Sequence, residues 1–341
     1  MEFISTSPKD TKLPSEEQLC IKFQASRVTI RRALSELIEK GYIYSYQGKG
    51  YFIKHDPQES PTVQSKGMVM YIYPDQTTSF PLKILKGLSD FFDKKDILLL
   101  NFPTFNILEK EDYYIMLAEK FGCTGLIIMP IDKDIYTNVQ LSLILKGFPT
   151  VLVDRKLFGL DLACISSDHY KMTFDATTYL LARRKNVLFI EHPRSASSSF
   201  DRINGYTDAV AQKSGATSLI YDPLKFSDFY KDESENMKID NYAAFLSEND
   251  VNGVICNSGL YTDFTIKAFK RLGKKLNDDY DLVVLDSDSD NLNEMVGKIS
   301  YIHQNAYQIG QTAAQELYNK IKSNKKPQSH IIPHVSNLIS D

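Results

Sequence analysis

Two arginines stand where a helix would normally place carboxylates. Arg27 and Arg31 fall in the first two turns of a predicted helix, and the partial positive charge of a helix N-terminus favours acidic side chains there. Cations in that place therefore indicate an external anion. A planar guanidinium group donates paired hydrogen bonds to phosphate oxygens or to the edge of guanine. The pattern predicts a surface that binds DNA.

Capping signals predict the two helices that carry this chemistry. Ser15 and Gln18 have the spacing of a capping box, so a first helix is expected to begin at Ser15. Ser26 has the same place before a second helix, which Gly41 ends because glycine tolerates positive φ. One apolar face of the second helix is expected to be buried: Ile30, Ala33, Leu34, Leu37 and Ile38. The residues that then point outward are Val28, Thr29 and Arg32.

A β-hairpin is predicted after the second helix. The β-rich runs 42–46 and 51–53 flank residues 47–50, whose sequence is Gln-Gly-Lys-Gly. This thin, basic tip has the size to enter a minor groove or to lie along a DNA backbone. Nine basic and six acidic residues give residues 1–55 a net charge of +3, so the chain total of −3 leaves −6 for the remainder. The charge asymmetry also points to DNA contact at this end.

Residues 13–53 resemble the winged-helix domain of GntR-type bacterial transcription regulators. The matching elements are the Leu-Pro-Ser-Glu start at 13–16, the Ser-Arg-x-Thr-x-Arg-x-Ala-Leu pattern at 26–34 and the Gly-x-Gly tip at 48–50. The resemblance implies a set of DNA-binding residues: Ser26, Arg27, Thr29, Arg31, Arg32, Lys49 and Gly50. Arg27, Thr29 and Arg31 would contact bases and phosphates, Ser26 and Arg32 would support them, and the last two would form the wing contact.

Two features depart from that family pattern. Glu17 stands where the family usually has an arginine, which removes one expected phosphate contact. Only twelve residues precede Leu13, fewer than the family's first helix needs, so that helix is expected to be missing or truncated. The structural alternative for the whole segment is a small helical domain with a solvated charged face.

Composition divides the chain into two domains of unequal size. Residues 56–66 are polar, contain two prolines and lack periodicity, so they are the predicted linker between a DNA-binding domain at 1–55 and a larger domain at 67–341. No apolar run has the length of a membrane span, and no signal-peptide layout is present. The cysteines lack metal-ligand spacing and are expected to be reduced core residues: Cys20, Cys123, Cys164 and Cys256. These features predict a cytoplasmic protein.

Apolar runs alternate with helical patterns through the larger domain. The predicted strands are Met68–Tyr73, Ile97–Phe102, Gly125–Met129, Thr150–Val153, Val187–Ile190, Gly253–Cys256 and Leu282–Leu285. Continuous apolar strands separated by helices are typical of α/β folds with parallel sheets covered on both faces. The number of strands exceeds one comfortable sheet. Two doubly wound lobes with a cleft between them would explain it, and ligands in such folds bind outside the carboxyl ends of the strands.

Polar residues gather at those strand ends, together with an aromatic side chain. The candidate ligand-binding residues are Thr78, Phe80, Asp154, Arg155, Arg202, Asn257, Asp286 and Gln304. Carboxylates accept hydrogen bonds from pairs of hydroxyl groups, guanidinium groups donate to sugar oxygens, and a phenyl ring covers an apolar sugar face. Taken singly, each has a structural alternative: a surface pair for Asp154 and Arg155, a helix cap for Asp286, and ordinary core for Phe80.

Residues 67–341 resemble the effector domain of LacI-type regulators and the related periplasmic sugar-binding proteins. The matching stretches are 124–130, 149–155, 201–206 and 303–310. In ribose-type members, the positions that match the six polar candidates from Asp154 to Gln304 contact the sugar, and Phe80 matches a stacking phenylalanine. Ser258 replaces a usual aspartate, and Pro81 stands in place of a second stacking phenylalanine.

The polar set implies a neutral monosaccharide, such as a pentose or a deoxyhexose. A phosphorylated sugar would need more uncompensated positive charge than these residues supply. A nucleoside remains an alternative, because aromatic stacking and the same polar side chains also suit a base and a ribose.

No constellation for catalysis, metal binding or a cofactor emerges from the sequence. Residues 286–290 begin like a calcium loop, but Asn291 replaces the turn glycine and Gly297 stands where a bidentate glutamate is needed. His330 and His334 have helical ligand spacing, yet Pro333 between them argues against a helix. We therefore expect neither an enzyme nor a bound cofactor or metal.

The two resemblances together imply a sugar-responsive transcription regulator, namely a repressor of carbohydrate-utilisation genes that binds a DNA operator as a homodimer. Closure of the cleft on a sugar would change the spacing of the two wings and hence their fit to paired half-sites. Whether the sugar weakens or strengthens DNA binding stays open. The alternatives are a sugar- or nucleoside-binding module that does not act in transcription, and a sugar-processing enzyme on a similar fold.

Overall fold

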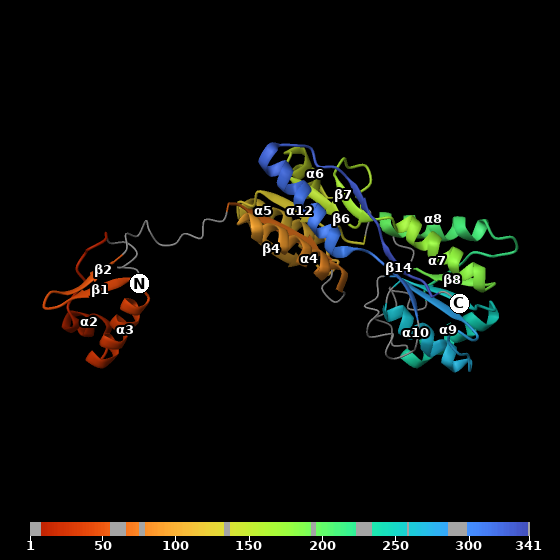
Figure 1. Ribbon diagram of the computed structural model, residues 1–341, viewed down its shortest axis with the longest axis horizontal. Coiled ribbons are helices and arrows are strands. Elements are labelled where there is room, and N and C mark those ends of the chain that lie inside the picture. Colours follow the sequence, from red (N-terminus) through yellow and green to blue (C-terminus); the bar gives the residue numbers. More distant parts are fainter. Residues whose placement is uncertain are drawn as a thin grey trace. The chain divides into compact units, whose positions relative to one another are not determined.

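The computed structural model of the chain divides into two compact units, Met1–Gln64 and Ser65–Asp341 (Figure 1). The structure describes residues 8–54, 66–74, 79–132, 137–191, 196–222, 234–257, 259–285 and 299–339. The boundary between the units falls inside the predicted linker, which apart from Lys66 lies outside the described residues.

The first unit contains two short helices and a hairpin. Its elements are α2 (Glu16–Phe23), α3 (Arg27–Glu39), β1 (Ile43–Tyr46) and β2 (Gly50–Ile53). Its core consists of Leu13, Leu19, Ile30, Leu34, Ile43 and Ile53. Residues 8–15 contain no helix, and Lys12 instead forms a bridge to Phe52 of β2. The first helix, expected to be missing or truncated, does not occur in residues 8–15, and the residues before them lie outside the described part of the chain.

The predicted capping signals are present at both helices. The backbone N–H of Ser15 donates to Oε1 of Gln18 at 2.9 Å, and the N–H of Gln18 donates to Oγ of Ser15 at 3.3 Å. Gly41 has φ of 74° after the last turn of α3. The N–H groups of Gly41 and Tyr42 reach the carbonyls of Ile38 and Leu37 at 2.9 Å, the paired bonds of a Schellman motif.

The buried face of α3 is narrower than the sequence predicts. Ile30 and Leu34 are buried and Leu37 is partly buried, but Ala33 is exposed and Ile38 is 38% exposed. The prediction of five buried positions is therefore wrong at Ala33 and Ile38. The physical reason is the small size of the unit, whose core has six buried side chains, of which α3 supplies Ile30 and Leu34.

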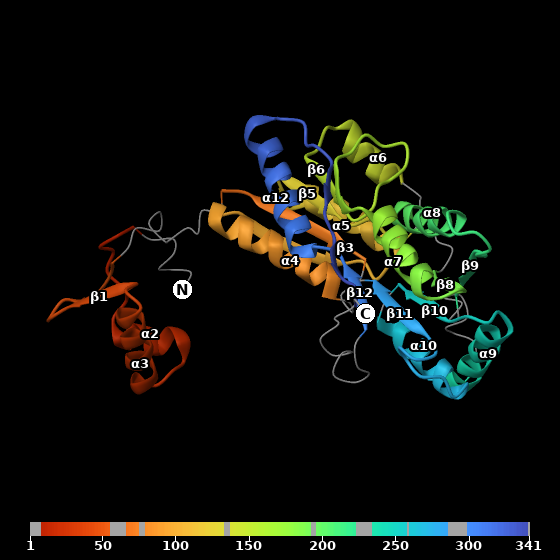
Figure 2. The same cartoon turned by 45° about the vertical axis from the view of Figure 1, so that its right-hand side comes forward.

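The second unit has two lobes, each with a six-stranded sheet among the described residues (Figure 2). In the first lobe the sheet order is β13-β7-β6-β5-β3-β4, all parallel. Its strands are β3 (Met68–Tyr73), β4 (Leu98–Pro103), β5 (Gly125–Ile128), β6 (Thr150–Val153), β7 (Cys164–Ser167) and β13 (His330–Ile332). Its helices are α4 (Ser79–Phe92), η2 (Asp93–Lys95), α5 (Leu108–Lys120), α6 (Asn138–Leu145) and α12 (Ala306–Ser323).

In the second lobe the sheet order is β14-β12-β11-β10-β8-β9, parallel except for the edge strand β14. Its strands are β8 (Val187–Ile190), β9 (Leu219–Tyr221), β10 (Gly253–Cys256), β11 (Asp281–Leu285), β12 (Ser300–His303) and β14 (Val335–Asn337). Its helices are α7 (His169–Arg183), α8 (Ser197–Ala211), α9 (Glu235–Glu248) and α10 (Gly259–Arg271).

Helices cover both faces of each sheet and bury most of the apolar strands that the sequence predicts; the exception is the edge strand β4, in which Leu98 is 51% exposed. In the first lobe, α4 and α12 share one core with the sheet, and α5 and α6 share another. In the second lobe, α7 and α8 lie on one face, with α9 and α10 on the other. In each lobe, the cores on the two faces of the sheet contain side chains from continuous apolar strands, as expected for parallel sheets.

The described chain crosses between the lobes three times. It leaves the first lobe between β7 and α7, returns between β12 and α12, and leaves again between β13 and β14. The carboxyl ends of the parallel strands therefore meet the crossings, and side chains at those ends lie beside the junction of the lobes.

Small residues let α4 and α12 approach closely. A Cβ atom on Gly87 would overlap the carbonyl oxygen of Tyr307, and one on Gly310 would overlap the carbonyl oxygen of Ile84. The late helix α12 therefore completes the core of the first lobe through backbone contact with α4.

The cysteines of the described residues are free thiols, and three of them are buried. Cys123, Cys164 and Cys256 are buried free thiols, whereas Cys20 is only partly buried, so the expectation of a core position is wrong for Cys20. The small core of the first unit leaves that side chain at its edge. Among the described helices, none combines the length and the apolar character that a bilayer span requires.

Candidate functional site

The N-terminal turn of α3 presents its polar side chains to solvent. Oγ of Ser26 accepts from the N–H of Thr29 at 3.2 Å, and the two hydroxyl oxygens lie 2.8 Å apart. Arg27 is exposed and makes no hydrogen bond or ion pair with the described residues, and Val28 beside it is 79% exposed. The Ser26 cap thus fixes the start of the helix and leaves Arg27 free to meet an anion.

Arg31 differs from Arg27 because it has an acidic partner inside the unit. Its Nε lies 2.9 Å from Oε2 of Glu16, whose other oxygen accepts from the hydroxyl of Tyr51 at 3.1 Å. The hydrogen bond from Arg31 lowers the pKa of the Glu16 carboxyl below its usual range. Arg31 therefore has an internal acidic partner that the sequence analysis did not identify. The contact between Arg31 and Glu16 links α3 to α2, and the hydrogen bond from Tyr51 to Glu16 links α2 to the hairpin.

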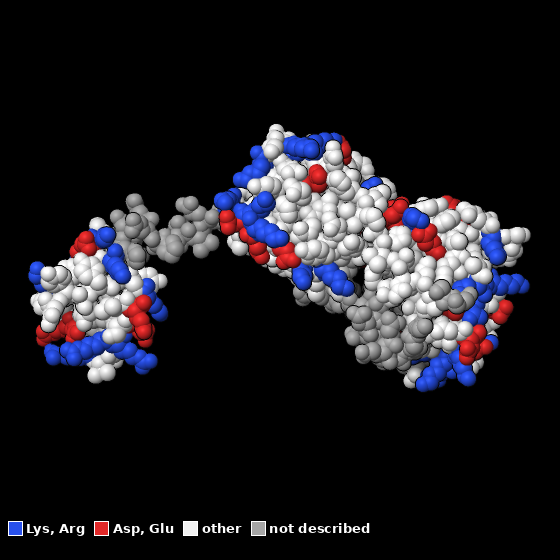
Figure 3. All heavy atoms as spheres, viewed as in Figure 1, with Lys and Arg blue, Asp and Glu red and all other residues white. Residues whose placement is uncertain are grey.

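The hairpin tip is held by its glycines. Gly48 and Gly50 have φ of +77° and +107°, and Ile43 pairs with Ile53 in antiparallel register. The ammonium group of Lys49 lies 4.7 Å from the centre of the Tyr46 ring. The visible face of this unit carries both basic and acidic groups (Figure 3). The predicted wing is therefore present as a hairpin with a cation at its tip.

In the second unit, one polar cluster lies at the strand ends of the first lobe. Arg155 donates from Nε to Oδ2 of Asp154 at 3.0 Å, and its Nη1 donates to Asp132. Asn106 donates to Asp132 at 3.1 Å and accepts from its N–H at 2.8 Å. Asp154 follows β6 and has φ of 70°, in the left-handed region that non-glycine residues seldom adopt. The guanidinium of Arg155 is thus held between two carboxylates.

His169 connects this cluster to the first crossing between the lobes. It begins α7 and is 3% exposed. Its Nε2 lies 2.9 Å from the carbonyl oxygen of Asp154 and 3.4 Å from Oδ1 of the same residue. Since both neighbouring atoms accept hydrogen bonds, the proton belongs on Nε2.

A second polar cluster lies at the strand ends of the other lobe. Glu191 directly follows β8 and is 1% exposed. Its Oε2 accepts from Nδ2 of Asn257 at 2.7 Å, and its Oε1 accepts from the Ser199 hydroxyl at 3.5 Å. Arg202 donates to Oδ1 of Asn257. The amide of Asn257 therefore joins a buried carboxylate to a guanidinium group.

Two contacts join the lobes beside these clusters. The N–H of Lys156, which follows the first cluster in sequence, donates to Oγ of Ser197 at 2.8 Å. The rings of Phe158 and Phe200 meet edge to face with centres 6.1 Å apart. Loop 155–158 of the first lobe is therefore in contact with the N-terminal turn of α8 in the second.

The structure places the predicted ligand-binding residues in several groups. Asp154 and Arg155 form one pair, and Arg202 and Asn257 form another in the opposite lobe. Gln304 is buried at the crossing before α12. Phe80 is partly buried against the core of the first lobe, the environment of its structural alternative. Thr78 and Asp286 lie outside the described residues.

The sequence analysis missed three residues of these clusters: Asp132, His169 and Glu191. Glu191 had a usable signal, because a carboxylate that directly follows an apolar strand obeys the same strand-end rule as Asp154. Asp132 lies four residues beyond β5, and His169 is placed by a crossing between lobes, so neither had a local pattern to reveal it. With these additions, the clusters contain three carboxylates and two guanidinium groups.

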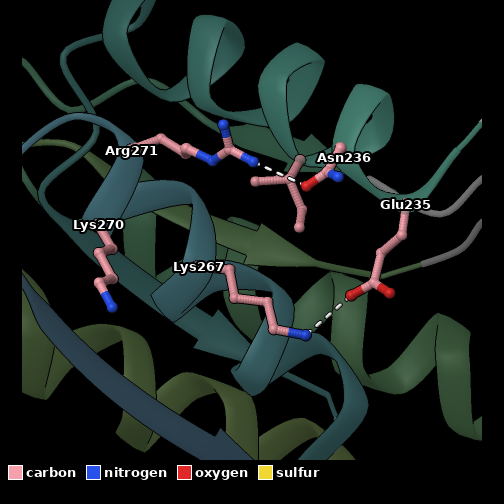
Figure 4. A pocket seen from close by; sticks show the side chains of 6 residues that line it. Glu235, Asn236, Lys267, Lys270 and Arg271 are labelled. Atoms are coloured by element: carbon pink, nitrogen blue, oxygen red, sulfur yellow. Dashed lines mark hydrogen bonds and ion pairs between the residues drawn. The ribbon is translucent and has the colours of Figure 1, made fainter.

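A hollow between α9 and α10 has no comparable arrangement (Figure 4). It has a volume of about 560 Å³ and is lined by Glu235, Asn236, Ile239, Lys267, Lys270 and Arg271. Lys267 pairs with Glu235 at 2.8 Å, and Arg271 donates to Asn236 at 2.8 Å. These are exposed surface pairs, whose individual contribution to stability is small.

Comparisons with known families match both units. Residues 101–326 match the family described as periplasmic binding protein domain, and residues 7–53 match that of bacterial regulatory proteins, gntR family. These matches agree with both resemblances seen in the sequence.

Among curated proteins, the chain is 28% identical over 210 residues to an arabinose metabolism transcriptional repressor of Geobacillus stearothermophilus, covering 60% of this chain and 56% of that protein. It is 24% identical over 264 residues to a ribose operon repressor of Lactococcus lactis subsp. lactis, covering 76% and 75%. The chain thus spans little more than half the length of the first of these relatives.

Solved structures share the two-lobed fold. A putative ribose operon repressor from Burkholderia thailandensis has a TM-score of 0.68 at 18% identity, over 80% of this chain and 99% of that chain. A Cra transcriptional dual regulator from Pseudomonas putida, in complex with fructose 1-phosphate, has a TM-score of 0.64 at 18% identity, over 80% and 99%. At these identities the likeness establishes the fold alone.

Proposed function

Because this chain belongs to the periplasmic binding protein domain family and carries a gntR-family unit before it, we propose that it is a sugar-responsive repressor of carbohydrate-utilisation genes. One observation carries the proposal, namely that two kinds of surface occur on the same chain. An exposed arginine lies at the start of a capped helix, and polar clusters lie at the strand ends of both lobes. The names of the arabinose and ribose repressors support the same assignment.

The effector is a neutral monosaccharide, such as a pentose or a deoxyhexose. Each guanidinium group of the proposed site already has an acidic or amide partner: Arg155 lies between Asp132 and Asp154, and Arg202 reaches Glu191 through Asn257. Sugar hydroxyl groups can both donate to these carboxylates and accept from these cations. A charged ester would instead add negative charge to a cluster in which carboxylates already outnumber guanidinium groups.

Lobe closure is the mechanism by which the sugar acts. Asp154 and Arg155 approach the sugar from one lobe, and Arg202 and Asn257 approach it from the other, so a bound sugar stabilises the form in which the lobes are close. The equilibrium shifts by the difference in affinity between the two forms. In a homodimer, that movement changes the separation of the two wings and thus the fit to paired half-sites.

The first test is a thermal-shift screen of the full chain against pentoses, hexoses, deoxyhexoses, their phosphates and nucleosides. Specific binding raises the midpoint of unfolding by mass action, and we expect a neutral sugar to give the largest shift. Binding of DNA from the promoter regions that flank its own gene is then measured with and without that sugar, at several salt concentrations.

Each result of the screen separates the proposed regulator from its alternatives. A shift with a nucleoside alone would keep the regulator and replace the effector. Sugar binding without any salt-dependent DNA binding would identify a binding module that does not act in transcription. Turnover of the bound sugar would indicate an enzyme.

A further inference from the structure

Glu191 is a buried carboxyl group at the edge of the proposed sugar site. It is 1% exposed and accepts hydrogen bonds from Asn257 at 2.7 Å and from Ser199 at 3.5 Å. A buried carboxylate is costly unless hydrogen bonds and a nearby cation compensate it. Here Asn257 links it to Arg202, so the cost is offset by the same side chains that are proposed to bind sugar.

The position of Glu191 is one that a phosphate group would otherwise suit. Ser199 lies in the first turn of α8, whose N-cap residue Ala196 makes no side-chain cap. The N–H groups and partial positive charge at the start of a helix attract phosphates. Arg202 lies on the same helix, so this part of the second lobe has two sources of positive potential, the Arg202 guanidinium group and the start of α8. The Glu191 carboxylate already contacts Ser199 in the first turn of that helix.

Glu191 also fixes the orientation of the Asn257 amide. Because the carboxylate accepts only, Nδ2 of Asn257 must face Glu191, and Oδ1 then faces Arg202. One hydrogen of Nδ2 and one lone pair of Oδ1 remain for a ligand. An amide with this arrangement suits a hydroxyl group, which both donates and accepts, better than a phosphate, which only accepts.

We propose that Glu191 is a specificity-determining residue that makes the effector site reject phosphorylated sugars in favour of neutral ones. It does so by neutralising Arg202 and the start of α8 and by opposing any further negative charge there. Selectivity of this kind depends on a repulsive element against the competitor as well as on attraction for the ligand. The inference rests on the proposed function, because it concerns the same sugar site.

The test is the ratio of two affinities in the full chain. Isothermal titration measures binding of D-ribose and D-ribose 5-phosphate, and of D-fructose and fructose 1-phosphate, to the wild type and to Glu191→Gln. The wild type is expected to prefer the neutral sugar. In Glu191→Gln the ratio of ester to sugar affinity is expected to rise at least about tenfold, which corresponds to about 1.4 kcal/mol. A merely structural role would weaken both ligands equally and leave the ratio unchanged.

Three variants control the experiment. Glu191→Asp keeps the charge and is expected to keep the preference for the neutral sugar. Glu119→Gln removes an exposed carboxylate that pairs with Lys146 on the first lobe, and its ratio is expected to equal that of the wild type. Glu191→Ala removes the charge without adding an amide, so it provides a second measurement if Glu191→Gln does not fold.

The outcomes separate this inference from the proposed function. A wild type that prefers the ester, or an unchanged ratio in a folded Glu191→Gln or Glu191→Ala, would overturn the inference and leave the sugar-responsive regulator intact. A wild type that binds none of the sugars or esters in the wider screen contradicts the proposed function itself, and the inference falls with it.

Discussion

The arginines of the two units differ in how their charge is compensated. On α3, Arg27 is exposed without an ion pair, and the side chain of Arg32 is 84% exposed beside Glu36. In the second unit, the side chain of Arg155 is only 14% exposed and lies between two carboxylates. Exposed cations suit a polyanion, whose binding releases counterions. Enclosed and balanced cations suit a neutral ligand, which they recognise through directional hydrogen bonds. One residue type thus has two electrostatic environments, which fit the two kinds of recognition proposed for this chain.

The largest effect is expected when an enclosed arginine is removed. Arg202→Ala is expected to weaken sugar binding by at least about thirtyfold, because loss of one member of a buried charged network leaves its partners uncompensated. DNA binding without sugar should be unchanged. Titration calorimetry and an electrophoretic mobility assay measure the two activities separately.

Arg271→Ala is the matched control, since Arg271 is an exposed arginine in the same lobe that pairs with Asn236 and Asp240. It should alter neither activity. Unchanged sugar affinity in a folded Arg202→Ala would remove the second-lobe cluster from the proposed site.

A buried carboxylate extends the comparison to acidic residues. Burial raises the pKa of Glu111 to about 7, although hydrogen bonds from the N–H of Ile131 and from Gln140 act in the opposite direction. The folded protein therefore holds a proton that the unfolded chain loses near its ordinary glutamate pKa. Between these two pKa values, the free energy of unfolding should fall as pH rises, by an amount on the order of 3 kcal/mol.

Denaturant unfolding at a series of pH values measures this slope. In Glu111→Gln the slope is expected to be much smaller, whereas Glu119→Gln, an exposed position on the same helix, should keep the wild-type slope. Equal slopes in the wild type and in a folded Glu111→Gln would show that Glu111 has the same protonation state in the folded and unfolded chain.

Removal of an exposed arginine should affect only the other unit. Arg27→Ala is expected to weaken operator binding by about fivefold to a hundredfold, the range for loss of one paired base contact. If Arg27 instead contacts a phosphate, the loss should be similar for all DNA sequences, and the salt dependence should decrease by about one counterion. Fluorescence anisotropy at several salt concentrations distinguishes the two.

Lys40→Ala, at the opposite end of α3, is the control for a general loss of positive charge. Equal effects of Arg27→Ala and Lys40→Ala would mean that net charge, and not the start of the helix, determines DNA binding. Sugar affinity should be unchanged in both variants.

The smallest effect is expected at the exposed ion pair of the first unit. Glu16→Gln removes the carboxylate that Arg31 contacts, and a solvent-screened ion pair of this kind contributes little to stability. We expect tighter binding to nonspecific DNA by less than about fivefold, because Arg31 becomes available to phosphates. Glu39→Gln, at the far end of α3, is the control. A large loss of affinity in Glu16→Gln alone would show that Glu16 positions Arg31 for DNA.

Strands with their own apolar signal could be predicted from the sequence. Met68–Tyr73, Thr150–Val153, Val187–Ile190 and Gly253–Cys256 are strands with the predicted bounds. Strands β7, β9, β13 and β14 were not predicted, because β7, β13 and β14 contain polar residues and β9 has only three residues. Such strands form only when the rest of the sheet provides a neighbour, so a local pattern cannot reveal them.

The candidate site shows the same limit. Asp154 and Arg155 could be chosen because they follow an apolar strand, and the structure joins them by a hydrogen bond of 3.0 Å. Asp132 lies beyond the end of its strand and reaches Arg155 only through the path of the loop. A residue that is placed by tertiary structure can thus be identified only from the fold. A residue that directly follows a strand can be predicted from the sequence.

The late position of α12 has a consequence for synthesis of the chain. The apolar face of α4, which includes Ile84, Leu88 and Phe92, is covered by a helix that begins only at Ala306. The lobe that leaves the ribosome first therefore cannot complete its core until almost the whole chain has been made. The second lobe lacks only its edge strand β14 once β12 has emerged. Since domains fold as their residues become available, the second lobe is expected to fold first. Until α12 has been made, the apolar face of α4 in the first lobe stays uncovered and can be bound by chaperones.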